Sequence, residues 1–256
     1  MRYKIEIYRN GKVKSLPGSN VFLQSDPAKL YELYIYVFIV KGNGKTLIIE
    51  TGCGDVSEIN KTNMEQNSGH NFFDIPEEER TASIISRANI DPGDVDFVLL
   101  THFHHDHCSN VDLFPNAKIV LSENGWLKYL KRDRFYFDNK TDFPSKPLNY
   151  ISSLDPAKLI LVRQELNILE GISAFWVGGH TPCCVAYEVL TEIGRAVFTS
   201  DIAFVEGNIT RNHPTGNFYD LKECYKGYEK IRKRADIILT THDPDILNKN
   251  FKEGKI

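Results

Sequence analysis

THFHHDH, at residues 101–107, places four imidazoles and one carboxylate within six consecutive positions. The segment follows residues 95–100, a short run rich in valine and leucine that is typical of a buried strand. Neutral histidine and ionised aspartate are the ordinary nitrogen and oxygen ligands of zinc and related divalent ions. A strand that ends at such a cluster directs several ligands from one rigid edge, so the pattern predicts a metal site. The alternative is a polar loop that is rich in histidine by chance.

Three later runs of strand-like sequence each end at one further potential ligand. His180 follows an apolar run and two glycines, Asp201 follows a second apolar run, and His242 follows a third. Each residue alone has an ordinary explanation, such as a capping side chain or a core histidine. Together, and in this order behind the His-x-His-x-Asp-His pattern, they are expected to complete the metal site.

With these residues in place, the chain resembles the metallo-β-lactamase fold superfamily, and within it most resembles the N-acyl homoserine lactonase-type dinuclear zinc hydrolases. The resemblance implies an α/β (α+β) fold, namely an αββα four-layer sandwich of two mixed β-sheets flanked by helices. It also implies a single hydrolase domain over residues 1–256. The pattern of strand runs with interleaved helices predicts by itself only an α/β or α+β class.

Carried over position by position, the resemblance implies seven ligands for two divalent metal ions. They are His102, His104 and His180 for the first ion, Asp106, His107 and His242 for the second, and Asp201 as the bridge. His105 is not a ligand in the family pattern. Nitrogen and oxygen donors favour zinc, with iron, manganese or cobalt as alternatives.

The reaction implied by this ligand set is hydrolysis. Two adjacent cations lower the pKa of a bridging water from about 15.7 towards about 7, which gives a metal-bridging hydroxide at neutral pH. Asp106 is the candidate catalytic residue, because it can bind metal and also pass a proton to the leaving group. The oxygen-reducing members of the superfamily carry glutamate at the second ligand position, where this chain has His104, so a redox role is not indicated.

Four features make the chain similar to lactonases in particular. They are a long loop before the first long hairpin, an acidic and proline-containing helix start at residues 74–80, Gly-His-Thr-Pro at 179–182 and His-Asp at 242–243. The expected function is therefore the opening of a lactone, either an N-acyl homoserine lactone or a related ring ester. The alternatives are a thioester, as in glyoxalase II-like enzymes, an aromatic lactone or a cyclic amide. A non-catalytic ligand-binding protein with the same fold is the alternative from another class.

The chain departs from the lactonase pattern close to the ligands. Lactonases carry a tyrosine three residues after the bridging aspartate, whereas this chain has a phenylalanine. The candidate substrate-binding residues are Phe204, His213, Tyr219 and His70. Glu50 replaces an aspartate that usually supports the metal site, and its longer side chain leaves that role open.

Two further groups of residues each have two interpretations. Cysteines beside the ligands are expected to be small buried hydrophobes, with thiolate ligation as the alternative: Cys108, Cys183 and Cys184. Aromatic residues in the segment 132–156 either line an apolar acyl pocket or pack that segment down: Phe135, Tyr136, Phe137 and Phe143.

The composition limits the expected partners. The chain has 256 residues, a formal net charge of -3 and 41% hydrophobic residues, which suits one globular domain acting on a small molecule. No basic run is long enough to follow a phosphate backbone, so a nucleic acid partner is not expected. The N-terminus lacks a signal-peptide pattern, residues 33–40 are too short to span a bilayer, and five cysteines without regular spacing argue against disulfides. We therefore expect a cytoplasmic protein without a membrane partner, as a monomer or homodimer.

Local elements are predicted from periodicity and turn residues. Residues 1–16 predict a hairpin, because residues 3–8 alternate and Asn10-Gly11 is a strong turn signal. Residues 34–50 predict a second hairpin, residues 56–73 a loop and residues 74–89 a helix. Further strands are expected at 118–121, 159–162, 165–169, 172–177, 185–190, 196–199 and 237–239, and further helices at 123–131 and 220–234.

Overall fold

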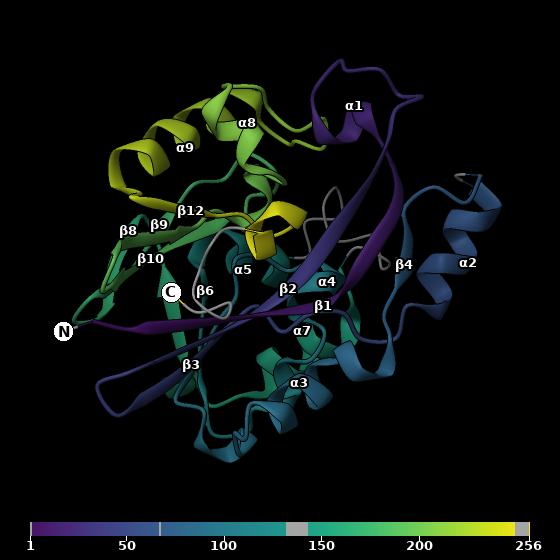
Figure 1. Cartoon of the computed structure of the whole chain (residues 1–256). Coiled ribbons are helices and arrows are strands. Elements are labelled where there is room, and N and C mark those ends of the chain that lie inside the picture. The colour runs from purple at the N-terminus through teal and green to yellow at the C-terminus, as the bar shows by residue number, and fades with distance from the viewer. Residues whose placement is uncertain (1, 67, 132–142, 249–255) are drawn as a thin grey trace.

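Two β-sheets lie face to face in the computed structural model, which describes residues 2–66, 68–131, 143–248 and 256 (Figure 1). Among these residues, seven strands form the first sheet, in the order β4-β1-β2-β3-β5-β6-β7. Their bounds are β1 Lys4–Pro17, β2 Leu30–Gly42, β3 Lys45–Ile49, β4 Phe72–Asp74, β5 Phe97–Leu99, β6 Lys118–Ser122 and β7 Leu159–Val162. The pairs on the β4 side of β3 are antiparallel and those on the β7 side are parallel, so the sheet is mixed.

The second sheet has five strands within the described ranges, in the order β12-β11-β10-β9-β8. Their bounds are β8 Glu165–Leu169, β9 Ile172–Trp176, β10 Val185–Thr191, β11 Gly194–Phe198 and β12 Ile237–Leu239. β12 pairs with β11 in parallel and the other pairs are antiparallel, so this sheet is also mixed.

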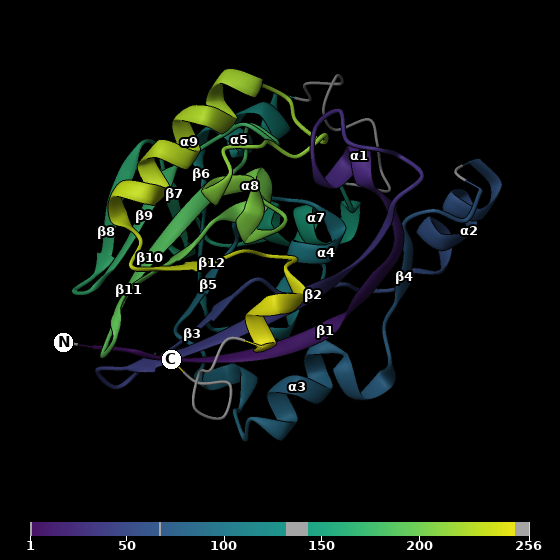
Figure 2. The same ribbon diagram turned by 45° about the horizontal axis from the view of Figure 1, so that its top comes forward.

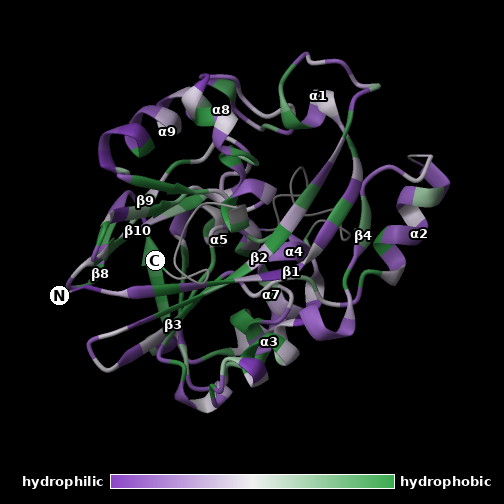
Figure 3. Ribbon diagram, viewed as in Figure 1, coloured by the Kyte–Doolittle hydropathy of each residue, from purple (hydrophilic) through white to green (hydrophobic). Residues whose placement is uncertain are grey.

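The core between the sheets follows from strand alternation, since successive side chains of a strand point to opposite faces. In β2, Tyr36 and Phe38 face the second sheet, while Val37 and Ile39 face the helices on the outer side. Phe38 meets Phe198 of β11 edge to face, with ring centroids 4.8 Å apart. Figure 3 shows the hydrophobic residues concentrated on these strands, whereas α9 and the connecting loops are largely hydrophilic.

Helices cover both outer faces and complete the four layers (Figure 2). Those on the first sheet are α3 Thr81–Arg87, α4 His105–Cys108, α5 Glu123–Leu130 and α7 Ser145–Ser153, and those on the second are α8 Glu206–Thr210 and α9 Leu221–Arg234. The remaining helices are α1 Gly18–Val21 and α2 Ser57–Gln66, with short 3-10 turns η1 Glu77–Glu79, η2 Pro92–Asp94, η3 Val111–Leu113, η4 Pro156–Lys158, η5 Ser200–Ile202 and η6 Pro244–Asn248. The predicted αββα sandwich of two mixed sheets is confirmed.

Three local predictions differ from the structure. The prediction of a hairpin at residues 1–16 is wrong, because β1 continues through Asn10-Gly11 with a register shift against β2. Asn10 is fully buried there, where its side-chain amide donates to the carbonyl of Glu79 and its Oδ1 accepts from the amide of Cys53. These long-range hydrogen bonds keep Asn10-Gly11 within the strand, although this pair of residues is common in turns.

The other two differences lie between β3 and β5. The predicted loop at 56–73 contains α2, and the predicted helix at 74–89 is divided into η1 and α3 by Arg80, which has an extended conformation. The predicted helix at 220–234 is confirmed, because Asp220 caps α9 by accepting from the amides of Lys222 and Glu223. No helix in the described part of the chain is long and apolar enough to cross a membrane.

Candidate metal centre

Strand direction brings three of the predicted ligands to one edge of the second sheet. β12 runs parallel to β11, and β9 runs in the same direction because both β9 and β11 are antiparallel to β10. The carboxyl ends of these three strands therefore lie at the same edge. His180, Asp201 and His242 follow those ends in the chain.

The first sheet delivers the other four ligands to the same edge. β5 ends at Leu99, His102 and His104 follow, and α4 then presents Asp106 and His107. The two sheets are joined here, since the amide of Val185 donates to the carbonyl of Thr101 at 2.9 Å.

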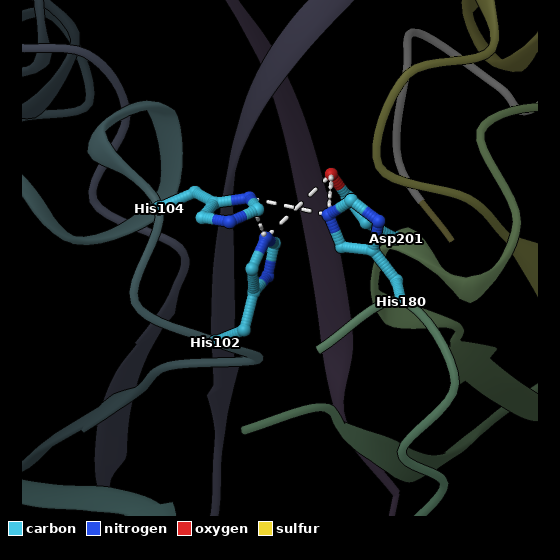
Figure 4. A group of neighbouring side chains, drawn as sticks. All are labelled: His102, His104, His180 and Asp201. Atoms are coloured by element: carbon cyan, nitrogen blue, oxygen red, sulfur yellow. Dashed lines mark hydrogen bonds and ion pairs between the residues drawn. The ribbon is translucent and has the colours of Figure 1, made fainter. Parts of the chain in front are cut away.

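The first cluster contains three imidazoles and one carboxylate, and Figure 4 shows all four side chains converging. Nδ1 of His104 lies 3.0 Å from Nε2 of His102 and 3.2 Å from Nε2 of His180. Oδ2 of Asp201 lies 3.6 and 3.7 Å from the Nε2 atoms of His102 and His180. One ligand atom from each residue therefore faces a common point.

The second cluster contains Asp106, His107 and His242. Oδ1 of Asp106 is 3.4 Å from Nε2 of His107, and its Oδ2 is 3.6 Å from Nε2 of His242. Oδ2 of Asp201 is also 3.4 Å from Nε2 of His107 and 3.2 Å from Nε2 of His242. The same oxygen of Asp201 thus lies between both clusters, as a bridging carboxylate would.

The donor atoms fit divalent cations. Imidazole nitrogens about 3 Å apart, as in the first cluster, repel one another unless a proton or a cation lies between them. Both ring nitrogens of His107 are buried and lack a well-formed hydrogen bond among the described residues, although carboxylate oxygens approach them. Nitrogen and oxygen donors in this arrangement are suited to zinc and neighbouring transition metals.

Backbone carbonyl groups orient His180 and His242 on the side of each ring that faces away from the clusters. Nδ1 of His180 lies 2.6 Å from the carbonyl oxygen of Asn217, and Nδ1 of His242 lies 2.8 Å from that of Tyr34. A metal-binding histidine usually donates its other ring N–H in this way, which fixes the tautomer and leaves Nε2 as the ligand.

Burial and charge set the protonation states of the cluster. Burial lowers the pKa of His102 and of His104, and neighbouring imidazoles lower both further, so the two rings are neutral. Burial raises the pKa of Asp106 and of Asp201, but the nearby histidines, His107 first, outweigh it and hold both well below the usual range. These are the forms that bind metal. Burial lowers the pKa of His107 and of His242, but the carboxylates of Asp201 and Asp106 outweigh it and raise both.

Glu50 supplies the carboxylate whose role the sequence left open. Its side chain is 1% exposed, Oε1 lies 3.2 Å from Nδ1 of His107, and the same oxygen accepts a short hydrogen bond from the hydroxyl of Thr101. Glu50 has a φ of 63°, which is unusual for a residue with a side chain. The longer side chain therefore still reaches His107, from a left-handed backbone conformation.

The cysteines near the ligands are apolar packing residues in this geometry. Cys108, Cys183 and Cys184 are buried, and none belongs to a potential metal-binding group in the described ranges. Burial raises the pKa of each thiol, to about 11 for Cys184, which disfavours the thiolate that metal binding requires.

A cavity of about 630 Å³ opens onto both clusters. Apolar residues on its walls include Val13, Leu16, Leu33, Phe73, Phe143 and Phe204. Polar residues include Thr62, Asn63 and Gln66 of α2, together with Asn71, His105 and Asn217. The two clusters thus form the floor of a pocket whose walls are partly apolar and partly polar.

Two of the four candidate substrate residues line this pocket. Phe204 is 5% exposed and lies edge-on to His180 and His242, with centroids 5.8 and 5.4 Å away. Tyr219 lines the pocket and is 46% exposed.

The other two candidates lie outside the described lining. Nε2 of His213 is 2.7 Å from the carbonyl oxygen of Leu23, and Nδ1 of His70 is 3.1 Å from that of Ser15. Each ring is therefore committed to a backbone contact, and the structure does not bring either to the pocket.

The sequence missed most of the wall. His105 and residues of α2 line the pocket, although the sequence predicts a loop at 56–73 and gives His105 no role as a ligand. The sequence does contain one indication that His105 is near the pocket, because this residue lies between two predicted ligands. Among the aromatic residues of the segment 132–156, Phe143 lies edge-on to His104 at 4.8 Å, while Phe135, Tyr136 and Phe137 lie outside the described residues.

Known proteins of similar sequence include metal-dependent hydrolases. The sequence profile of the family described as "Metallo-beta-lactamase superfamily" matches residues 30–242. The chain is 22% identical over 235 residues to an N-acyl homoserine lactonase of Bacillus thuringiensis, covering 89% of this chain and 88% of the relative. It is 26% identical over 161 residues to a probable metallo-hydrolase of Methanocaldococcus jannaschii, covering 62% of each.

Solved structures show the same fold at low identity. An N-acyl homoserine lactone hydrolase with the product N-hexanoyl-L-homoserine at its catalytic metal centre superposes with a TM-score of 0.82, at 18% identity over 98% of both chains. A dizinc quorum-quenching lactonase superposes with a TM-score of 0.68, at 17% identity over 94% of this chain and 88% of that one.

Proposed function

The chain belongs to the metallo-β-lactamase superfamily and is a metal-binding hydrolase of that group, and on this premise we propose that it opens the ring of a lactone. The substrate is an N-acyl homoserine lactone or a related ring ester. The observation that carries the proposal is the placement of Asp201 Oδ2 within 3.7 Å of four histidine nitrogens, on the floor of a pocket large enough for a small acylated ring.

The seven converging residues would hold two divalent ions. The first would bind His102, His104 and His180, the second Asp106, His107 and His242, and both would bind Asp201. When bound, such a pair polarises a carbonyl group and supplies an activated water at neutral pH. Zinc is the proposed metal, with iron, manganese or cobalt as alternatives.

Residues of the protein would transfer the proton, hold the ligands in place and exclude water. Asp106 is held ionised, so it can accept a proton as water attacks and then deliver it to the ring oxygen when the C–O bond breaks. Glu50 and the carbonyl of Tyr34 keep the rings of His107 and His242 in place. Phe204 covers the centre beside His180 and His242, which excludes water from that side.

The pocket walls support a lactone that carries an acyl chain. Leu16, Leu33 and Phe204 form one apolar cluster, and Val13 and Phe73 form part of a second one next to it. Burial of a methylene group against such surfaces contributes about 0.8 kcal/mol. A chain of several carbons would therefore be bound mainly by these walls.

An aromatic lactone is the second candidate. It is favoured by the rings of Phe73, Phe143 and Phe204, which line one pocket, and by the absence of a hydroxyl at Phe204. Offset or edge-on stacking of a ring-fused substrate on such side chains contributes about 0.5–1.5 kcal/mol per pair.

The test is acid release by the zinc-loaded protein, measured with a pH indicator. N-hexanoyl and N-decanoyl homoserine lactone are compared with dihydrocoumarin, an aromatic lactone, and with a glutathione thioester. The proposal predicts rapid opening of the homoserine lactones and slow hydrolysis of the thioester. Opening of dihydrocoumarin alone would favour the second candidate, and hydrolysis of the thioester alone would contradict both.

A further inference from the structure

The two carboxylate oxygens of Asp201 have different neighbours. Oδ2 lies within 3.7 Å of four histidine Nε2 atoms, which belong to both clusters, and Figure 4 shows this oxygen directed at the rings of His102 and His180. Oδ1 instead accepts a hydrogen bond from the hydroxyl of Thr241 at 2.5 Å. A hydroxyl that donates to an ionised carboxylate at such a short distance forms a strong hydrogen bond. Asp201 is thus held through one oxygen and presents the other to the clusters.

Strand pairing places Thr241 beside Asp201. β12 pairs in parallel with β11, and the amide of Thr199 extends this pairing by donating to the carbonyl of Leu239 at 3.0 Å. Thr241 and Asp201 follow these two strand ends, and each is 3% exposed. The chain is also fixed directly after Thr241, since the carbonyl of His242 accepts from a backbone amide of β2 at 3.0 Å. The hydroxyl therefore projects from a backbone that is restrained on both sides.

The hydrogen bond from Thr241 limits the rotation of the Asp201 carboxylate. The last torsion of an aspartate side chain has a broad energy profile, so the group turns easily when nothing holds it. Threonine is branched at Cβ and stiff about its first side-chain torsion, which gives its hydroxyl a defined position. The hydroxyl has a single proton to donate, and Oδ1 accepts it. This contact thereby determines which oxygen faces the histidines.

We propose that Thr241 is a positioning residue, whose hydroxyl holds Asp201 so that Oδ2 alone is shared by the two metal ions. This inference rests on the proposed function, because it requires two bound ions. Without the hydroxyl, the carboxylate is free to turn and to bind one ion through each oxygen. A bridge of one atom holds two ions closer together than a bridge of three atoms. A close pair can act on the same ester group, so the hydroxyl supports the reaction without touching the substrate.

Thr240 provides a matched control within the same strand end. It is the same type of residue, one position earlier, and is 1% exposed, but its Oγ1 has no hydrogen-bond partner among the described residues. Removal of an unpaired buried hydroxyl by a side chain of the same shape is nearly neutral or stabilising. Thr240→Val should therefore leave the site unchanged, whereas Thr241→Val removes the contact with Asp201.

The first test is a crystal structure of the zinc-loaded parent protein, which needs no variant to fold. The inference predicts that Oδ2 of Asp201 is bonded to both ions and that Oδ1 still accepts from the hydroxyl of Thr241. An ion bonded to Oδ1, or a Thr241 hydroxyl that has turned to another acceptor, would overturn it.

The second test compares the parent protein with Thr241→Val, Thr241→Ser and Thr240→Val, each loaded with cobalt. Cobalt with a higher coordination number absorbs visible light more weakly, so the spectrum reports whether Oδ1 has joined the ligands. We expect weaker absorption per ion in Thr241→Val, and a fall of about 10–100-fold in kcat/KM for N-hexanoyl homoserine lactone. Thr241→Ser, which retains the hydroxyl, should restore both properties, and Thr240→Val should match the parent.

The parental spectrum and activity in Thr241→Val, or equal losses in both valine variants, would overturn the inference and leave the proposed lactone opening in place. Two bound ions in a parent protein that opens no lactone would contradict the proposed function instead. The zinc-loaded structure and the cobalt spectra then still decide the role of Thr241. A parent protein that binds a single ion would overturn the inference, because Asp201 would have no pair of ions to bridge.

Discussion

The floor and the wall of the pocket are built differently. On the floor, the proposed metal-binding residues follow rigid strand ends, and five of the seven are at most 8% exposed: His102, Asp106, His107, Asp201 and His242. On the wall, α2 is a short helix at the edge of the molecule whose only buried residue is Asn63 (Figure 1). The floor residues are thus restrained by the buried surroundings, whereas α2 makes few contacts with the rest of the protein.

Because of this difference, we expect the floor to carry out the reaction and the wall to determine which substrates react. Several floor residues are oriented by a second group, such as Glu50 for His107 or the Asn217 carbonyl for His180. Substitution on the floor should therefore abolish hydrolysis of every substrate. Substitution on the wall should change the ranking of substrates and leave the metal content intact.

The largest effect is expected for Asp201→Asn. The change removes the negative charge that lies between both clusters, so both ions should bind more weakly. Metal analysis should give well under two ions per chain, and lactone opening should fall by more than about 10²-fold, the cost of one lost electrostatic contact in a transition state. Full activity with two retained ions would show that Asp201 does not bridge the site.

A smaller effect is expected for Glu50→Gln. The amide cannot stabilise the Nδ1–H of His107 as a carboxylate does, and loss of such an outer partner typically costs about 10–100-fold in metal affinity or activity. Zinc affinity should be measured by competition with a chelator. Glu229→Gln on the exposed side of α9 is the matched control and should bind zinc as the parent does. If the two variants bind zinc equally well, Glu50 does not support the site.

The wall is tested by Leu33→Val, which removes about one methylene group from the pocket side of β2. The loss should lower kcat/KM by about fourfold for N-decanoyl homoserine lactone. N-butanoyl homoserine lactone, whose chain ends sooner, should be affected less, and the metal content should not change. Leu161→Val on β7, outside the described pocket lining, is the control. The same loss on both substrates would place the acyl chain elsewhere.

The smallest effect on activity is expected for Asn60→Ala. Asn60 joins α2 to β4, because its amide donates to the carbonyl of Phe73 at 2.7 Å and its Oδ1 accepts from the amide of Phe73 at 2.8 Å. Its loss should destabilise this junction by about 1–3 kcal/mol. Hydrogen exchange should become faster in α2 but not in the strands of the metal floor. Uniform acceleration across the chain would mean that α2 is not a separate, weakly held part of the wall.

The floor could be predicted from the sequence because its signals are local. The segment 101–107 contains four of the proposed ligands, and the other three each follow a strand with clear apolar character. Parallel strand direction then brings these ends together. The structure added the reach of Glu50, which depends on a positive φ that no residue pattern indicated.

The wall could not be predicted because tertiary contacts specify it. Residues 57–66 are rich in polar side chains, and α2 packs through Ile59 and the two hydrogen bonds between Asn60 and Phe73. Asn10-Gly11 does not form the predicted turn for the same reason, since Asn10 forms hydrogen bonds with residues more than 40 positions away. Contacts between distant segments leave little local signal.

Anomalous scattering at the zinc edge, from crystals of the zinc-loaded protein, tests the metal floor most directly. The geometry predicts two peaks, one among His102, His104 and His180 and the other among Asp106, His107 and His242, with Asp201 beside both. A single peak, or a peak bound by other side chains, would contradict the assignment of the seven ligands and with it the proposed hydrolysis.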